Sequence, residues 1–192
     1  MKTLAGYTVA ALVLAAATTL SASAQATTPD MPAKSDAPAK PLLSPAATAE
    51  TTLAGKSVVI HYNSPSLRGR KMIGEHDPYD KVWRTGANPA TTLITATDLK
   101  IGKLVVPAGT YTLYSLPEAP GTPWQLIINK QTGQWGTVYK PEMDLGRTPM
   151  TAKPVSPPQE AMSITFENVH GKKGELHVRW ADVDEYVKIE AK

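Results

Sequence analysis

From about residue 53 onward, glycine and proline interrupt the chain at short intervals, and this spacing is the strongest constraint on its fold. The segments between them are short, rich in Val, Ile, Thr, Tyr and Trp, and often alternate between apolar and polar residues. A period of two is typical of strands, and no stretch has a convincing helical period. We therefore predict an all-β fold, a two-sheet antiparallel β-sandwich of about eight or nine strands.

Individual strands follow from the same pattern. They are predicted at residues 56–63, 91–97, 104–106, 110–116, 124–129, 135–139, 163–167 and 175–180, with a last short strand at Val187 and Ile189. The Pro107-Ala108-Gly109 step predicts a hairpin between the strands on either side of it, and the turn at 130–133 predicts a second hairpin. In the strand 175–180, alternation predicts one buried face and one solvent-exposed face, with His177 and Arg179 on the solvent-exposed face.

The strands are predicted to form one domain behind a flexible segment. Residues 27–52 are rich in Pro, Ala, Thr and Ser and have no sustained apolar periodicity, so we predict a Pro/Ala-rich flexible linker. The remaining residues, 53–192, have the length of a single ordinary domain with a core of its own.

Residues 1–26 have the layout of a secretory signal peptide. Lys2 precedes an apolar stretch from Val9 to Ala17, and small residues near Ala24 and Ala26 offer cleavage positions. The apolar stretch is short for a membrane span. We therefore predict an exported protein, periplasmic or extracellular, cleaved near Ala24 or Ala26 and without a transmembrane segment in the mature chain.

Several kinds of site are excluded or unsupported by composition. The chain has no cysteine, which excludes disulfides and thiolate metal ligands. Its formal net charge of +3 is spread along the sequence, so no nucleic-acid partner is predicted. The four histidines lack the spacing of a zinc motif, and neither a phosphate-binding glycine loop nor a nucleophile elbow occurs. We predict no metal site and no cofactor, and the sequence does not indicate an oligomeric state.

The segment Val82–Asn88 carries the densest group of candidate site residues. It places an aromatic ring, a cation, a hydroxyl and a carboxamide around Gly86. Because glycine and asparagine accept a positive φ, we predict a sharp turn that presents Arg84, Thr85 and Asn88 together at the end of a strand. This turn can serve as a binding site or as a structural corner.

The chain resembles an uncharacterised bacterial family, Domain of Unknown Function 2911, over essentially the whole predicted domain. The residues that carry the resemblance are Ser64-Pro65, Gly69-Arg70, the block from Tyr79 to Asn88, Pro107 to Tyr111, Pro117, Trp124, Asn129, Trp135-Gly136, Tyr139, Asp144 and Arg147. The family pattern usually has Glu after the Gly-Ala-Asn step, whereas this chain has Pro89, so that carboxylate is absent here. The resemblance implies an exported β-rich domain and supplies no established activity.

Four arginines lie in or beside turn-rich segments: Arg68, Arg70, Arg84 and Arg147. A guanidinium fork suits a carboxylate, phosphate or sulfate group, so convergence of two or three of them would form an anion pocket. The alternative is that Arg84 or Arg147 pairs internally with Asp144 or Asp80 and stabilises a fold that has no disulfide.

The tryptophans divide into two pairs. Trp124 and Trp180 lie in apolar strand patterns and are predicted to be core residues. Trp83 and Trp135 each lie beside a glycine-containing turn, so this pair is the candidate for a surface on which a sugar ring could stack.

Three classes of function remain open. The leading hypothesis is non-catalytic binding of a small polar or anionic ligand, such as a saccharide. The candidate ligand-binding residues are Arg70, Trp83, Arg84, Thr85, Asn88, Trp135, Asp144 and Arg147. The second is a hydrolase- or lyase-type enzyme that uses Asp144 or His76 as base, with Arg84 or Asn88 stabilising negative charge. The third is a purely structural or protein-interaction module.

Overall fold

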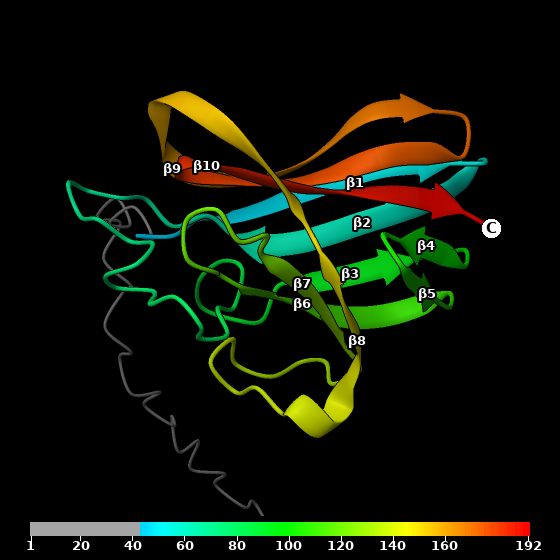
Figure 1. The fold of residues 1–192 in the computed structure, drawn as a ribbon. Helices are drawn as coiled ribbons and strands as arrows, with labels where there is room; N and C mark the ends of the chain where they lie inside the picture. Colours follow the sequence, from blue (N-terminus) through cyan, green and yellow to red (C-terminus); the bar gives the residue numbers. More distant parts are fainter. Residues whose placement is uncertain (1–42) are drawn as a thin grey trace, which may run out of the picture. The chain divides into compact units, whose positions relative to one another are not determined.

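The computed structural model describes residues 43–192, and within them the chain is built almost wholly of strands (Figure 1). The elements in chain order are β1 (Ala46–Leu53), β2 (Lys56–Asn63), β3 (Thr92–Thr95), β4 (Leu99–Ile101), β5 (Leu104–Val106), β6 (Gly109–Leu116), β7 (Gln125–Asn129), the 3-10 turn η1 (Pro141–Met143), β8 (Asp144–Pro149), β9 (Thr151–His170) and β10 (Lys173–Ala191). The predicted all-β class is confirmed. The predicted signal peptide and residues 27–42 of the predicted linker lie outside the described residues.

The strands form two antiparallel sheets. The larger sheet has the order β1-β2-β3-β6-β7-β8, and the smaller has the order β5-β4-β10-β9. Leu113 and Leu126 of the larger sheet belong to the same buried cluster as Val178 and Ile189 of the smaller sheet. The predicted two-sheet antiparallel sandwich is therefore confirmed, with ten strands among the described residues where about eight or nine were expected.

Strand β1 corrects the predicted boundary of the linker. Residues 46–52 are not part of a flexible segment, because β1 pairs with β2 along its whole length. The two strands are joined by Ala54 and Gly55, whose φ values of +50° and +75° suit a tight hairpin turn. Ala49 and Leu53 are buried, and the Ala- and Thr-rich strand gives only a weak apolar signal. The folded part therefore begins before residue 53.

The predicted hairpin at Pro107-Ala108-Gly109 is wrong. β5 pairs with β4 in the smaller sheet, whereas β6 pairs with β3 and β7 in the larger sheet. The step between them therefore carries the chain from one sheet to the other, and Ala108 N donates to Asp98 Oδ1 at 2.8 Å. A turn signal predicts a change of direction, but it does not determine which strand becomes the partner.

The second predicted hairpin is also wrong, because residues 135–139 form no strand. β7 pairs instead with β8, and the residues between them form a long loop. Buried side chains hold this loop: Asn129 Nδ2 donates to the Lys140 carbonyl at 2.9 Å, and the Tyr114 hydroxyl donates to the Val138 carbonyl at 2.8 Å. These contacts replace a ladder of backbone hydrogen bonds.

β9 and β10 are longer than predicted and bend together. The predicted separate strand at Val187 and Ile189 is the end of β10. The pairing of β10 with β9 loses its register on both sides of Ala181, whose φ is +53°. The ends of β10 come together, since Ala191 N donates to the Lys172 carbonyl at 2.8 Å.

The predicted solvent-exposed face of residues 175–180 is wrong at His177, which is fully buried.

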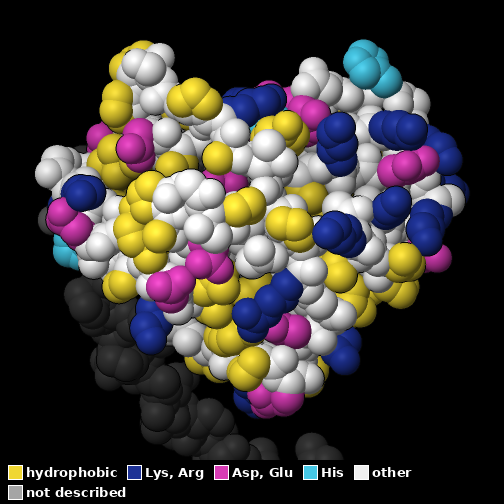
Figure 2. Space-filling view, viewed as in Figure 1, with side chains coloured by type: hydrophobic (Ala, Val, Ile, Leu, Met, Phe, Trp, Pro, Cys, Tyr) yellow, Lys and Arg dark blue, Asp and Glu magenta, His cyan; other side chains and the backbone are white. Residues whose placement is uncertain are grey.

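Charge is distributed unevenly over the surface. Figure 2 shows lysine and arginine side chains gathered toward the side where β4 and the end of β10 lie. Lys100 belongs to β4, and Lys173 and Lys188 belong to β10. Within residues 43–192, no helix is long and apolar enough to cross a membrane.

Candidate functional site

The segment Val82–Asn88 turns sharply, as predicted. φ is +51° at Thr85, +153° at Gly86 and +59° at Asn88. Glycine and asparagine tolerate this region of backbone space, whereas a β-branched threonine is strained in it. Contacts with the rest of the fold must therefore hold the turn in place.

Four of the eight predicted site residues line one cavity at this turn: Arg70, Trp83, Arg84 and Asn88. The cavity has a volume of about 260 Å³, and Arg68 and Asp77 also line it. We refer to it as the arginine corner. Arg70, Arg84 and Asn88 therefore lie around one cavity, whereas Asp144 and Arg147, which belong to the same set of candidates, do not line it.

Arg84 is held by backbone and packing contacts. Its Nε donates to the Gly86 carbonyl at 3.3 Å, and a Cβ atom at Gly136 would lie 2.7 Å from Arg84 Cδ. Among residues 43–192, no carboxylate oxygen lies within 4.0 Å of its guanidinium group. Burial raises the pKa of Asp77, which shares the cavity, and the charges of Arg84, His76 and Arg70 offset part of that increase.

Thr85 and Trp83 belong to the architecture of the corner. The Thr85 side chain is fully buried, with Oγ1 2.8 Å from Ser115 Oγ, and its carbonyl accepts a hydrogen bond from Thr91 Oγ1 at 2.8 Å. Trp83 is buried and stacks on Trp180 with the ring centroids 5.6 Å apart. The Trp83 ring is therefore not available as a surface for stacking a sugar.

Trp135 lies beside the corner but does not line it. The residue is 53% exposed, and its backbone bridges to Pro89. Trp124 and Trp180 are both buried, which confirms their predicted place in the core. Of the predicted stacking pair, only Trp135 therefore presents a ring to solvent.

Asp144 and Arg147 form a separate network on β8. Arg147 Nη2 lies 3.1 Å from Asp144 Oδ2, and the Tyr139 hydroxyl donates to the same carboxylate oxygen at 2.7 Å. Asn129 Nδ2 donates to Asp144 Oδ1 at 2.9 Å. Burial and the Asp144 carboxylate raise the pKa of Tyr139 to about 12. Neither Asp144 nor Arg147 lines the arginine corner, so the internal pairing considered for Arg147 is the arrangement found.

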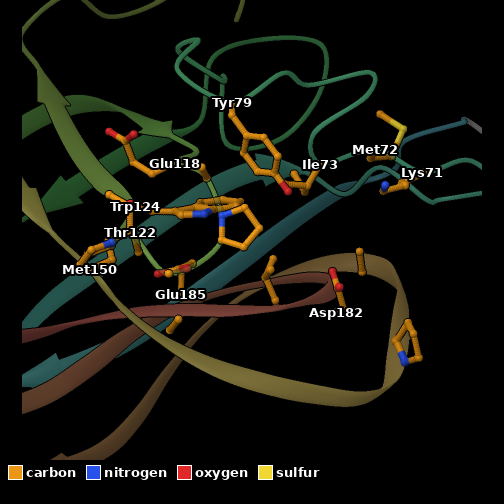
Figure 3. Close-up of a pocket in the computed structure, with 18 of the residues that line it drawn as sticks. Lys71, Met72, Ile73, Tyr79, Glu118, Thr122, Trp124, Met150, Asp182 and Glu185 are labelled. Carbon is orange, nitrogen blue, oxygen red and sulfur yellow. The ribbon is translucent and has the colours of Figure 1, made fainter.

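A second and larger cavity lies beside the arginine corner, with a volume of about 760 Å³. Figure 3 shows its walls: Tyr79 comes from the loop between β2 and β3, Trp124 precedes β7, and Glu185 comes from β10. We refer to it as the chamber. Arg70 and Met72 line both cavities, so these two side chains form a shared wall.

The chamber exists because β9 and β10 lose register at their bend. Between the pairs Ala181–Gln159 and Val183–Pro154, β10 contains one residue, and β9 contains the four residues 155–158. The extra length of β9 cannot stay in the ladder, so it moves away from β10 and leaves space. Pro158 of this segment lines the chamber.

Glu185 is the one buried carboxyl side chain that lines the chamber. It is 2% exposed, and its Oε2 atom is buried and has no hydrogen-bond partner among the described residues. Burial raises the pKa of Glu185 to about 7, and the charge of Asp184 adds to the increase. A buried carboxyl group without a partner is costly to ionise, and it can receive a hydrogen bond from a ligand.

Sequence reasoning missed Glu185, although a signal was present. Val187, Ile189 and Ala191 are buried at alternate positions of β10, while Lys188 is exposed. Extending that period of two backward places Glu185 on the core-facing side. A charged residue at an inward strand position is a candidate functional group. Glu185 was not recognised as one, because residues 187–189 were interpreted as a separate strand that did not include it.

Comparison with known proteins gives one match. A family model described as a protein of unknown function, DUF2911, matches residues 44–189. The chain belongs to the DUF2911 family. No curated protein and no solved structure matches the chain significantly.

The DUF2911 match includes Arg84 of the arginine corner and Glu185 of the chamber. It begins at residue 44, shortly before β1, in agreement with a folded part that starts before residue 53. Within the described part of this DUF2911 protein, no group of three or more His, Asp or Glu side chains is placed to hold a metal ion.

Proposed function

We propose that this DUF2911 domain binds a small anionic ligand at the arginine corner and does not catalyse a reaction on it. The observation that carries the proposal is the environment of Arg84. Its guanidinium shares a cavity with Arg70 and Asn88, and no carboxylate of residues 43–192 lies within 4.0 Å of it. A planar cation beside a carboxamide is suited to a carboxylate or phosphate group.

The binding hypothesis is favoured over the enzyme alternative by the position of Asp144. A general base must lie within hydrogen-bond reach of the reacting group, and Asp144 lies outside the cavity that holds Arg84 and Asn88. Its carboxylate is already bound to Asn129, Tyr139 and Arg147. His76 does not line the corner either.

The exposed ring of Trp135 supports a ligand that carries a sugar ring. It lies beside the corner, because Gly136 N donates to the Asn88 carbonyl at 3.0 Å. An acidic saccharide could place its carboxylate at Arg84 and its ring toward Trp135. Suitable probes are glucuronate and glucose 6-phosphate, with neutral glucose as the uncharged comparison.

Calorimetry with these probes tests the proposal through two matched variants. Arg84→Met should abolish binding of the anionic probes and leave the free energy of unfolding nearly unchanged, since Arg84 has no contacting carboxylate to leave unpaired. Arg147→Met is the control: it removes an arginine of the Asp144 network and should retain binding. The proposal fails if glucose binds as well as glucuronate, if neither anionic probe binds, or if Arg84→Met strongly destabilises the fold.

We also propose that the protein is exported, either to the periplasm or outside the cell. The support is the arrangement of Lys2, the apolar stretch from Val9 to Ala17 and the small residues near Ala24 and Ala26. Mass spectrometry of protein from the native host should give an N-terminus at Gln25 or Thr27. An intact Met1 on the mature protein would contradict export through cleavage.

A further inference from the structure

We propose that the chamber is a second binding site, separate from the arginine corner, and that it takes a small organic amine that donates hydrogen bonds to Glu185. This inference goes beyond the proposed function, because it concerns another cavity and a ligand of opposite charge. Three features of the chamber support it: the buried carboxyl group of Glu185, the apolar and aromatic side chains that line the chamber, and the charged residues among them.

The carboxyl group is the first element of the site. Glu185 is 98% buried on the core-facing side of β10, and no described residue gives a hydrogen bond to its Oε2 atom. Buried carboxyl oxygens in folded proteins are nearly always paired, so an unpaired one that lines a cavity needs an explanation. An ammonium group entering the chamber would supply the missing donors and the missing positive charge.

The walls suit the body of such a ligand. Trp124 and Tyr79 contribute aromatic rings, and Ile73 and Met150 contribute apolar side chains (Figure 3). Val183 also lines the chamber. Aromatic rings attract cations through their faces, and apolar walls favour an aliphatic or aromatic carbon skeleton. A volume of about 760 Å³ lies within the range of small-molecule sites.

The charges around the chamber favour a cation over an anion. Glu118 and Asp182 line it together with Glu185. Arg70 also lines it, but its Nε and Nη2 atoms donate to the Leu67 and Ser66 carbonyls, both at 3.0 Å. Lys71, the other basic residue that lines the chamber, is exposed and pairs with Glu75 at 3.4 Å. Arg70 keeps its positive charge, because backbone carbonyls are neutral, whereas the charge of Lys71 is paired with Glu75. Three acidic side chains therefore line the chamber together with one unpaired base.

The proposed binding mode makes affinity depend on pH. An ammonium group binds the ionised form of Glu185, and protonation of this carboxyl group, whose pKa is raised to about 7 by burial, competes with binding. Affinity should therefore rise about tenfold between pH 6 and pH 8, because the ionised fraction rises about tenfold over that interval. A ligand that accepts a hydrogen bond from protonated Glu185 would show the opposite trend.

Tryptamine is the probe, and two indoles of similar size are its comparisons: tryptophol, which is neutral, and indole-3-propionate, which is an anion. Calorimetric titrations of the full chain at pH 6 and pH 8 should show binding of tryptamine, stronger at pH 8, and at least tenfold weaker binding of both comparison compounds. NMR shift changes confined to residues of the chamber should locate the bound amine.

Two carboxylate variants on β10 complete the test. Glu185→Gln removes the charge with little change of shape, and it should weaken tryptamine binding at pH 8 at least tenfold and remove the pH dependence. Glu190→Gln, whose parent side chain pairs with Lys172 away from the chamber, should bind like the wild type. Unfolding curves show whether each variant is folded.

The proposal is overturned if the folded wild type does not bind tryptamine at millimolar concentration, if either comparison compound binds as well, or if Glu185→Gln binds unchanged. These outcomes do not bear on the arginine corner, which is tested with anionic probes and Arg84→Met. The two proposals can therefore fail independently.

Discussion

Asp184 and Glu185 are neighbours on β10, are equally buried, and have opposite surroundings. Asp184 is 3% exposed and Glu185 is 2% exposed. Asp184 Oδ1 lies 2.7 Å from His177 Nδ1, and Arg179 Nε donates to Asp184 Oδ2 at 2.8 Å. Glu185, on the other side of the strand, lines the chamber without a partner for Oε2. Two equally buried carboxyl groups of one strand therefore differ in whether the fold supplies them with partners.

The Asp184 side of the strand is a closed ionic network. Arg179 donates to both carboxylate oxygens of Glu167, and this contact lowers the pKa of Glu167. The ring of Tyr186 stacks on His177 at 5.0 Å. Every charged group in this network contacts an opposite charge or a ring, which is the arrangement expected of a structural element. The Glu185 side lacks such contacts, which is why we assign a ligand to that side alone.

The largest expected change in the free energy of unfolding comes from removing a charged member of the closed ionic network. Arg179→Met removes the cation shared by Glu167 and Asp184, and it leaves the buried Asp184 with His177 as its only close partner. We expect the free energy of unfolding to fall by about 3 kcal/mol, because a buried carboxylate loses a charged partner. Denaturant unfolding at pH 7 measures the change. A shift of less than about 1 kcal/mol, comparable to that of an exposed pair, would show that the network contributes little.

On the chamber side, a substitution is expected to raise the free energy of unfolding rather than to lower it. Glu185→Gln should stabilise the folded protein at pH 8 by about 2 kcal/mol, because it removes a buried charge without breaking a contact. The full pKa shift, from 4.5 to about 7, corresponds to about 3 kcal/mol, but the buried Gln amide also lacks a partner. Unfolding curves for both proteins at pH 8 give the comparison.

The stabilisation should also depend on pH in a defined direction. The folded wild type keeps the Glu185 proton up to about pH 7, whereas the unfolded chain releases it near pH 4.5. This group therefore makes the wild type less stable as pH rises from about 4.5 to about 7, with no further change above that range. The advantage of Glu185→Gln should be smallest near pH 4 and largest at pH 8. An advantage that is the same at both pH values would argue against a raised pKa.

The smallest effect is expected at a third carboxylate of the same strand. Glu190 pairs with Lys172 at 2.9 Å on the surface, and this contact lowers the pKa of Glu190. Since exposed pairs contribute little to stability, Glu190→Gln should leave the denaturant midpoint unchanged within error. A clear change of the midpoint would mean that any carboxylate on β10 affects stability, whatever its burial and partners. Such a result would weaken the contrast between Asp184 and Glu185.

Much of the fold follows from alternation and turn chemistry in the sequence. β2 and β5 have their predicted limits, because each is a short run of β-branched or apolar residues between turn residues. The choice of partner strands does not follow: the chain changes sheets at Pro107-Ala108-Gly109, where a local signal suggests a hairpin. In a sandwich, pairing is decided by which apolar faces can meet, and this involves residues far apart in sequence.

The candidate site was predictable in part. Gly86 and Asn88 indicate the turn that presents Arg84, but only the folded chain brings Arg70 to the same cavity and keeps Arg147 away from it. Glu185 stands in an alternating apolar pattern that reveals its inward position. The space in front of it arises from the lost register between β9 and β10, and no local sequence pattern encodes that space.

The most direct test of the central claim is an NMR titration of the Glu185 side-chain carboxyl carbon. In the free protein we predict a midpoint near pH 7, because the group is buried and unpaired. With tryptamine bound, the midpoint should move to lower pH, because the ammonium group stabilises the carboxylate. A midpoint near 4.5 in the free protein would mean that Glu185 is solvated or paired, and it would contradict both the contrast with Asp184 and the proposed amine site.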